Sequence, residues 1–179
     1  MRNKAVLIIP YFGNIPDYFN LWLKSAEANC EFNFYIYTDL ASKVNKNSNV
    51  KIKYMTFDFI KQKIKRMFGN SVKINSPYKL CDYKPAYGDI FYDDIKEFDF
   101  WGFCDIDLIF GYLSHFITDD ILDKNEKVFY HGHFSLFKNT PTMNRLYLRK
   151  YNGVCDYNIA FHTNYCCHFD EDGTVAYAP

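Results

Sequence analysis

Residues 100–111 read FWGFCDIDLIFG and place two carboxylates, Asp105 and Asp107, inside an otherwise apolar run. An ionised carboxylate that leaves water is destabilising by several kcal/mol unless a cation or hydrogen-bond donors compensate its charge. A continuous apolar run is typical of a strand covered on both faces, and in sheets of such strands ligands bind beyond the carboxyl ends. We therefore expect a strand over residues 99–105 to end at a site that holds both charges.

The rest of the chain alternates short apolar strands with amphipathic helices. Further strands are expected at residues 5–10, 33–38 and 50–57, with two short ones in 127–139 joined at Gly132; helices are expected at 17–29 and 58–68, up to residue 98, and in 140–151. This alternation predicts one α/β domain over residues 1–179, with three layers and a mostly parallel sheet.

Composition excludes several classes of protein. The chain has 21 basic and 21 acidic side chains, so a formal net charge of zero gives no electrostatic reason to expect a nucleic acid partner. No segment approaches the roughly 20 apolar residues that span a bilayer. The first apolar run is broken by Pro10 and lacks a small-residue cleavage site, which indicates a strand rather than a signal peptide. We expect a cytoplasmic protein.

The six cysteines contain no C-x-x-C pair and no framework spacing, so reduced, mostly buried thiols are expected. Cys155, Cys166, Cys167 and His168 form a cluster in sequence that suggests zinc. Adjacent cysteines diverge in an extended chain, however, and rarely bind one structural ion together. Zinc is therefore the minor alternative for this cluster.

Two D-x-D triplets occur, and their surroundings distinguish them. Asp170 and Asp172 lie beside Gly173 in a polar stretch, which favours a solvated turn. Asp105 and Asp107 share one face of an extended chain at a spacing of about 6.8 Å, close enough to reach one divalent ion if the chain bends. Mn²⁺ or Mg²⁺ takes one or two protein carboxylates and completes its shell with water and phosphate oxygens. The triplet therefore predicts a metal and diphosphate site, and the alternative is a pair of turn or helix caps.

Four motifs together carry a resemblance to a known family: PYFG at 10–13, KLCDYKPAYGDIF at 79–91, the stretch at 100–111, and GHFSLFKN at 132–139. They resemble bacterial glycosyltransferases from surface-polysaccharide (lipopolysaccharide or capsule) gene clusters, of the GT-A type. The resemblance implies a Rossmann-like α/β/α nucleotide-diphospho-sugar transferase fold and a hexosyltransferase activity. It also implies a UDP-sugar as the favoured donor, a glycan or lipid-linked acceptor, and association with the inner face of the membrane without a transmembrane segment.

The resemblance also implies roles for individual residues. Asp105 and Asp107 become the metal ligands, and Asp170 and Glu171, in an F-D-E segment, contact the acceptor or act as the catalytic base. The implied substrate-binding residues are Pro10, Tyr11 and Phe12 at the base, Asp39 at the base or ribose, Asp82, Lys84 and Tyr87 near the donor sugar or phosphate, and Gly132 and His133 along the site. A third metal ligand stays unassigned between His162 and His168.

Two expectations concern the extent of the chain and the role of Lys84. The chain ends at YAP, residues 177–179, without a closing helix or strand, so we expect a C-terminal acceptor-side portion to be missing. Lys84 is expected to act on the donor rather than on the fold, so that Lys84→Met leaves the melting temperature nearly unchanged.

Two other functions remain alternatives. In a dehalogenase-like phosphotransferase or phosphatase, the first Asp of a D-x-D motif is a covalent nucleophile. That motif lies near the N-terminus and ends in Thr or Val, whereas here it lies past residue 100 and Ile109 fills the final position. A non-catalytic carbohydrate-binding module would suit the 20% aromatic content but gives no reason to place Asp105 and Asp107 in an apolar run.

Overall fold

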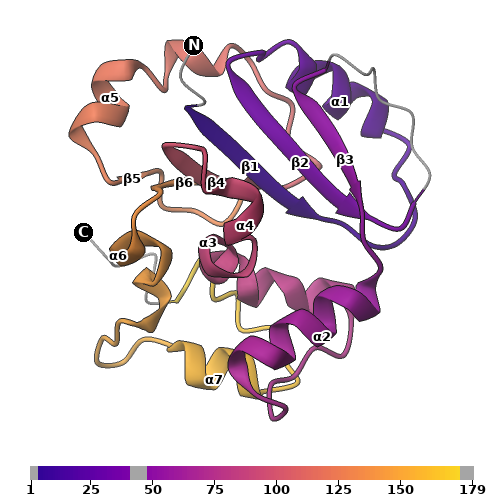
Figure 1. Cartoon of the computed structure of the whole chain (residues 1–179), viewed down its shortest axis with the longest axis vertical. Helices are drawn as coiled ribbons and strands as arrows, with labels where there is room; N and C mark the ends of the chain where they lie inside the picture. Colours follow the sequence, from indigo (N-terminus) through magenta and orange to yellow (C-terminus); the bar gives the residue numbers. More distant parts are fainter. Residues whose placement is uncertain (1–3, 41–47, 174–179) are drawn as a thin grey trace.

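The computed structural model of the chain describes residues 4–40 and 48–173 (Figure 1). The terminal YAP segment, on which the expectation of a missing portion rests, lies outside these residues. The described residues form an α/β domain with one six-stranded sheet.

The sheet has the strand order β3-β2-β1-β4-β6-β5. Its strands are β1 (Ala5–Pro10), β2 (Phe32–Thr38), β3 (Val50–Tyr54), β4 (Phe100–Cys104), β5 (Lys127–Val128) and β6 (Phe134–Lys138). The first four run parallel, with Ala5 paired to both Phe32 and Phe100. β6 runs antiparallel to its neighbours β4 and β5, so the sheet is mixed but mostly parallel, as the sequence predicts.

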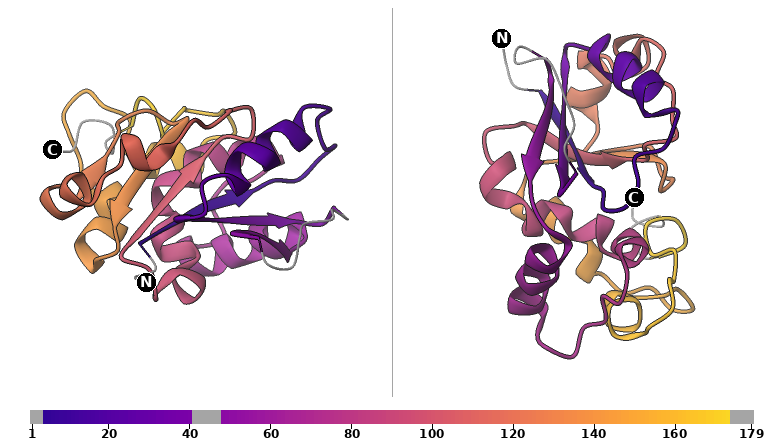
Figure 2. Two further views of the ribbon diagram at one scale, coloured as in Figure 1. Left: turned by 90° about the horizontal axis from the view of Figure 1, so that it is seen from above. Right: turned by 90° about the vertical axis from the view of Figure 1, so that its right-hand side faces the viewer.

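Helices cover both faces of this sheet (Figures 1 and 2). The α-helices are α1 (Phe19–Glu27), α2 (Phe57–Phe68), α3 (Tyr87–Ile90), α4 (Tyr92–Ile95), α5 (Asp119–Lys124), α6 (Pro141–Asn144) and α7 (Tyr157–His162), and the 3-10 helices are η1 (Pro77–Ala86), η2 (Leu113–His115) and η3 (Leu146–Leu148). Alternate side chains of β1 enter two separate cores, as its continuous apolar sequence requires. Leu7 packs with α1 and α5, and Ile8 packs with η1 and the helices of the opposite face.

Two local predictions need correction, and one helix was not predicted. The helix expected up to residue 98 is only the four-residue α4, preceded by α3 and by the ten-residue η1, in which Pro85 lacks the N–H that a regular α-helix requires. The helix expected in 140–151 breaks at Arg145 into α6 and η3. Helix α7 was not predicted; it begins where Asp156 accepts a hydrogen bond from the Ile159 N–H.

Candidate functional site

A cleft of about 560 Å³ opens at the carboxyl ends of β1 and β4. It is lined by residues that follow these two strands, by η1, by the loop before β6 and by the segment after α7. The predicted site residues line this cleft, apart from Asp39, Asp82 and Gly132. Asp39 is exposed at the end of β2. The structure therefore brings together segments more than 150 residues apart in sequence, from Pro10 to Glu171.

Asp105 and Asp107 lie just beyond β4 rather than inside a buried strand. The strand ends at Cys104, after which the Asp105 N–H donates to the His133 carbonyl at 2.9 Å. The side chain of Asp105 is 32% exposed, and Asp107 is exposed. The strand expected over residues 99–105 is therefore one residue shorter at each end, and the chain enters the cleft just before the first carboxylate.

Lys84 supplies the cation that holds Asp105. Its amine donates to Asp105 Oδ1 at 2.8 Å, to Asp170 Oδ2 at 2.8 Å and to the Gly132 carbonyl at 2.9 Å. Burial lowers the pKa of Lys84, but the two carboxylates outweigh it and raise the pKa above its ordinary value. An ammonium has three donors, so all of them are used within the protein. We call Lys84, Asp105 and Asp170 the open centre. Its ammonium links the segments of Asp105, Gly132 and Asp170 and is not free in the cleft.

Gly132 has a packing role in this centre. A Cβ atom there would lie 2.5 Å from Asp170 Oδ2 and 2.5 Å from Glu171 Cγ. Glycine therefore lets the loop before β6 approach the C-terminal segment closely enough for its carbonyl to reach Lys84. The close approach explains why this position is buried behind the cleft rather than on its surface.

Asp170 is the most enclosed carboxylate of the cleft. The residue is 5% exposed, and its Oδ1 atom accepts no hydrogen bond from any residue that the structure describes. Burial raises the pKa of Asp170, and the nearby Lys84 opposes this shift. His133 lies between two other carboxylates of the cleft, those of Asp105 and Glu171. Its Nδ1 atom is 3.4 Å from Asp105 Oδ2 and 3.8 Å from Glu171 Oε1.

Aromatic side chains and a thiol complete the lining. Tyr11 and Tyr18 lie near each other after β1, and Tyr78 at the start of η1 is 63% exposed. Tyr87 is buried and donates to the Leu80 carbonyl, which orients it as part of the wall. Burial raises the pKa of the Cys81 thiol to about 12, so this sulfur is neutral at physiological pH.

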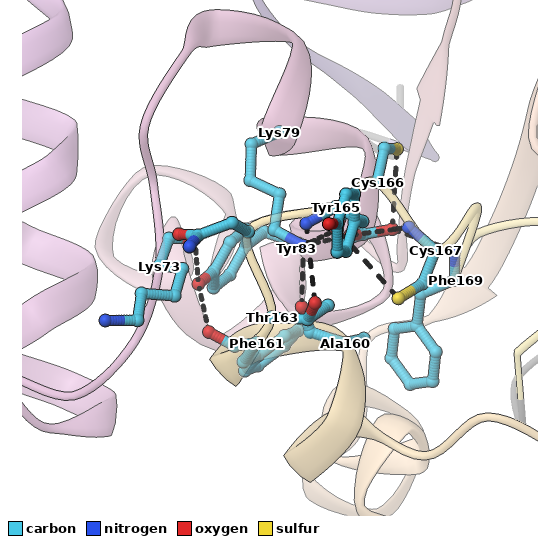
Figure 3. Close-up of polar contacts among 12 residues, drawn as sticks. Lys73, Lys79, Tyr83, Ala160, Phe161, Thr163, Tyr165, Cys166, Cys167 and Phe169 are labelled. Atoms are coloured by element: carbon cyan, nitrogen blue, oxygen red, sulfur yellow. Dashed lines mark hydrogen bonds and ion pairs between the residues drawn. The ribbon is translucent and has the colours of Figure 1, made fainter.

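Asp82 lies outside the cleft in a second lysine–aspartate pair, which we call the closed centre. Lys79 and Asp82 have side chains that are 1% and 0% exposed, with a 2.6 Å separation between Nζ and Oδ2. The N–H groups of Cys167 and Phe169 donate to the Asp82 carboxylate at 3.0 Å. Lys79 also donates to the carbonyls around the end of α7, including that of Tyr165 (Figure 3). The placement corrects the prediction that Asp82 contacts a substrate.

The closed centre anchors the segment that enters the cleft. Phe169, fully buried, is followed at once by Asp170, so the hydrogen bond from the Phe169 N–H to Asp82 fixes the approach of the next carboxylate. Asp82 lies three positions after Lys79, a spacing at which side chains on a helical turn meet. That spacing was a local signal for the pair, but nothing in the sequence indicated its partners after α7.

Metal ligands and cysteines were also predicted from the sequence. Within residues 4–40 and 48–173, no three His, Cys, Asp or Glu side chains are grouped to hold a metal ion, and this applies to the cluster at Cys155, Cys166 and Cys167. Cys104 is buried and Cys30 is exposed, while the other four cysteines are intermediate, so the thiols are less buried than expected.

No helix in the described part of the chain is long and apolar enough to cross a membrane.

Fold and site together define an α/β protein with a polar and aromatic cleft at the carboxyl edge of its sheet. The chain belongs to the family described as "Family of unknown function (DUF6625)", which matches residues 7–178. Searches of curated proteins and of solved structures find no significant match. Because the family description states no activity, the resemblance to glycosyltransferases stays a prediction.

Proposed function

We propose that this protein is a metal-dependent glycosyltransferase with a GT-A-like fold, which binds a nucleotide sugar in the cleft and transfers its sugar to a hydroxyl group. The observation that carries the proposal is the position of Asp105 and Asp107. From β1 the chain proceeds to β2 and β3 on one side of the sheet and returns to place β4 on the other side. Ligands of open α/β sheets bind at such a switch point, and both carboxylates line the cleft there.

The donor set fits Mn²⁺ or Mg²⁺ when a diphosphate completes it. Lys84 engages Asp105 Oδ1, which leaves Oδ2 facing His133, and Asp107 is exposed in the same cleft. Two carboxylates are the usual protein contribution to such an ion when phosphate oxygens and water supply the rest. Bound there, the ion would supply positive charge for the departing diphosphate. Lys84 would hold Asp105 in place, in a protein with no net charge to attract an anion.

Other cleft residues suit the remaining parts of the ligand. Pro10, Tyr11 and Phe12 follow β1 and offer aromatic surface for the nucleotide base. Asp170 has an unpartnered oxygen and a raised pKa, which brings a carboxylate closer to the range in which general bases work. In the proposed reaction, the acceptor hydroxyl gives its proton to Asp170 Oδ1 while its oxygen attacks the anomeric carbon. The bond from that carbon to the nucleotide diphosphate breaks, and the diphosphate leaves with the electron pair.

Nucleoside diphosphate release tests the proposal. The protein is incubated with a panel of UDP-, GDP- and TDP-sugars and manganese, with and without saccharide acceptors. We expect manganese-dependent release from at least one donor, lowered at least about 100-fold by Asp105→Asn because one electrostatic contact is lost. Asp120→Asn is the matched control, since Asp120 is 71% exposed on α5 and pairs with Lys124.

Two results would replace the proposal with another function. Phosphate release from p-nitrophenyl phosphate without nucleotide-sugar turnover would favour the phosphotransferase alternative. Saccharide binding with neither turnover nor nucleotide binding would favour a carbohydrate-binding module.

A further inference from the structure

Tyr78 is a feature of the cleft that the proposed reaction does not use. It lies at the start of η1, is 63% exposed and lines the cleft with Asp170 and Glu171. The neighbouring Cys81 and partial burial raise the pKa of Tyr78, and the charges of Asp170 and Glu171 contribute to the same shift. An exposed aromatic face beside carboxylates is thus available to a ligand.

Asp170 Oδ1, which the proposed reaction also uses, is the second observation. Asp170 is only 5% exposed, and its Oδ1 atom has no hydrogen-bond partner among the described residues. Its other oxygen, Oδ2, is held by Lys84 at 2.8 Å. A buried acceptor without a donor is unfavourable, and native proteins satisfy nearly all such atoms. Asp170 lines the cleft, and a ligand O–H or N–H group would satisfy this oxygen once the side chains that cover it shift aside.

We infer that Tyr78, Asp170 and Glu171 form a saccharide subsite, in which the apolar face of a sugar ring packs on Tyr78 and a ring hydroxyl donates to Asp170 Oδ1. A neutral polyhydroxylated ring has both surfaces that this arrangement requires. In the proposed function a metal ion offsets the charge of Asp105 and Asp107 for a diphosphate, whereas no ion is assigned to Asp170 and Glu171, so these two carboxylates favour a neutral ligand. Under the proposed function, on which this assignment of a role rests, the ring is that of the acceptor.

Saccharide binding is measurable without a nucleotide, so the subsite can be tested separately. The probes are methyl glycosides of common hexoses and of N-acetylhexosamines, titrated into the full chain and followed by saturation-transfer NMR. We expect saturable binding of at least one glycoside, weakened up to about tenfold by Tyr78→Ala and largely restored by Tyr78→Phe, because the ring face rather than the hydroxyl makes the contact. Asp170→Asn should also weaken binding.

A matched control and a second ligand make the result decisive. Tyr112→Ala removes a ring that is 67% exposed on another part of the surface and should leave glycoside affinity unchanged. UDP affinity in manganese should be unaltered by Tyr78→Ala. If UDP binds but no glycoside does, or if Tyr78→Ala binds glycosides like the wild type, the subsite is wrong and the proposed function survives. If glycosides bind and UDP does not, the subsite stands and the proposed function fails. Methylamine serves as a cationic probe of the two carboxylates. If it binds and no glycoside does, the assigned ligand class is wrong.

Discussion

Lys79 and Lys84 lie on the same 3-10 helix and both bind aspartate, yet the fold satisfies the two centres to different extents. In the closed centre, Lys79 and Asp82 are almost fully enclosed, and backbone groups around α7 use their remaining hydrogen-bonding capacity. In the open centre, Asp105 is 32% exposed and Asp170 Oδ1 has no partner within the described residues. Similar chemistry thus stabilises the chain in one place and leaves binding capacity at the cleft in the other.

The contrast gives a way to separate structural from functional charges. A buried pair whose atoms are all satisfied by the protein has nothing left to offer a ligand, so its loss should appear in stability. A pair that keeps an accessible or unpartnered oxygen should lose less stability and more binding. The following variants test this division in order of the expected change in the free energy of unfolding.

Asp82→Ala should produce the largest loss. It leaves the Lys79 ammonium buried without its counter-ion and removes the acceptor for the N–H groups of Cys167 and Phe169. Breaking such a pair typically costs about 3–5 kcal/mol. Urea unfolding followed by circular dichroism measures the change, and Asp120→Ala, in an exposed pair, should lose less than about 1 kcal/mol. A loss for Asp82→Ala as small as that of the control would remove the distinction between the centres.

Lys84→Met should lose an intermediate amount, about 1–3 kcal/mol, because Asp170 and the Gly132 carbonyl lose their donor while Asp105 can turn to water. The sequence alone suggested an unchanged melting temperature, and the geometry of the amine revises that expectation. The same urea titration measures the loss, with Lys124→Met as the exposed control. Unaltered stability together with lost UDP binding would restore the view of Lys84 as a free donor-binding cation.

Alkaline pH should weaken the open centre by a smaller amount. The carboxylates of Asp170 and Asp105 overcome the effect of burial and raise the pKa of Lys84 in the folded state. A lysine with a raised pKa contributes its full stability below the unfolded value of about 10.4 and loses that contribution as the pH rises through the folded value. The wild type should therefore lose stability more steeply above about pH 10.4 than Lys84→Met does. Parallel pH profiles of the two proteins would contradict this.

Much of the fold was predictable because it rests on local patterns. Hydrophobic spacing predicted the apolar run of β1, the strand at β2 and the amphipathic α2, and Gly69 marked the end of α2. The region after residue 76 was less predictable, since η1 contains Pro85 and its shape depends on contacts with residues near α7.

The site was predictable in its residue types but not in its contacts. Asp105 was singled out as a charge that something must hold, and the structure supplies Lys84, 21 residues earlier in the chain. The other partner of Lys84, Asp170, lies 86 residues after it, a separation at which sequence spacing carries no geometric information. Tyr78 was missed because one exposed tyrosine among 16 has no distinguishing local pattern.

Asp107→Asn should change stability least, by less than about 0.5 kcal/mol, because the side chain is exposed and lies outside the bonds of the open centre. The substitution should instead weaken ligand binding. Urea unfolding of this variant therefore sharpens the comparison with Asp82→Ala, since the two aspartates should divide cleanly between binding and stability. A loss comparable to that of Asp82→Ala would show that Asp107 is structural.

Calorimetric titration of UDP tests the central claim most directly. The titration is performed on the wild type in manganese, on the wild type with a chelator, and on the Asp105→Asn, Asp107→Asn double variant in manganese, after circular dichroism has verified its fold. The account predicts saturable binding in the first case, with affinity lost or lowered at least about tenfold in the other two as the cation or its ligands are removed. Equal UDP affinity under all three conditions, or no binding in any of them, would contradict the claim that these carboxylates hold a metal and a nucleoside diphosphate.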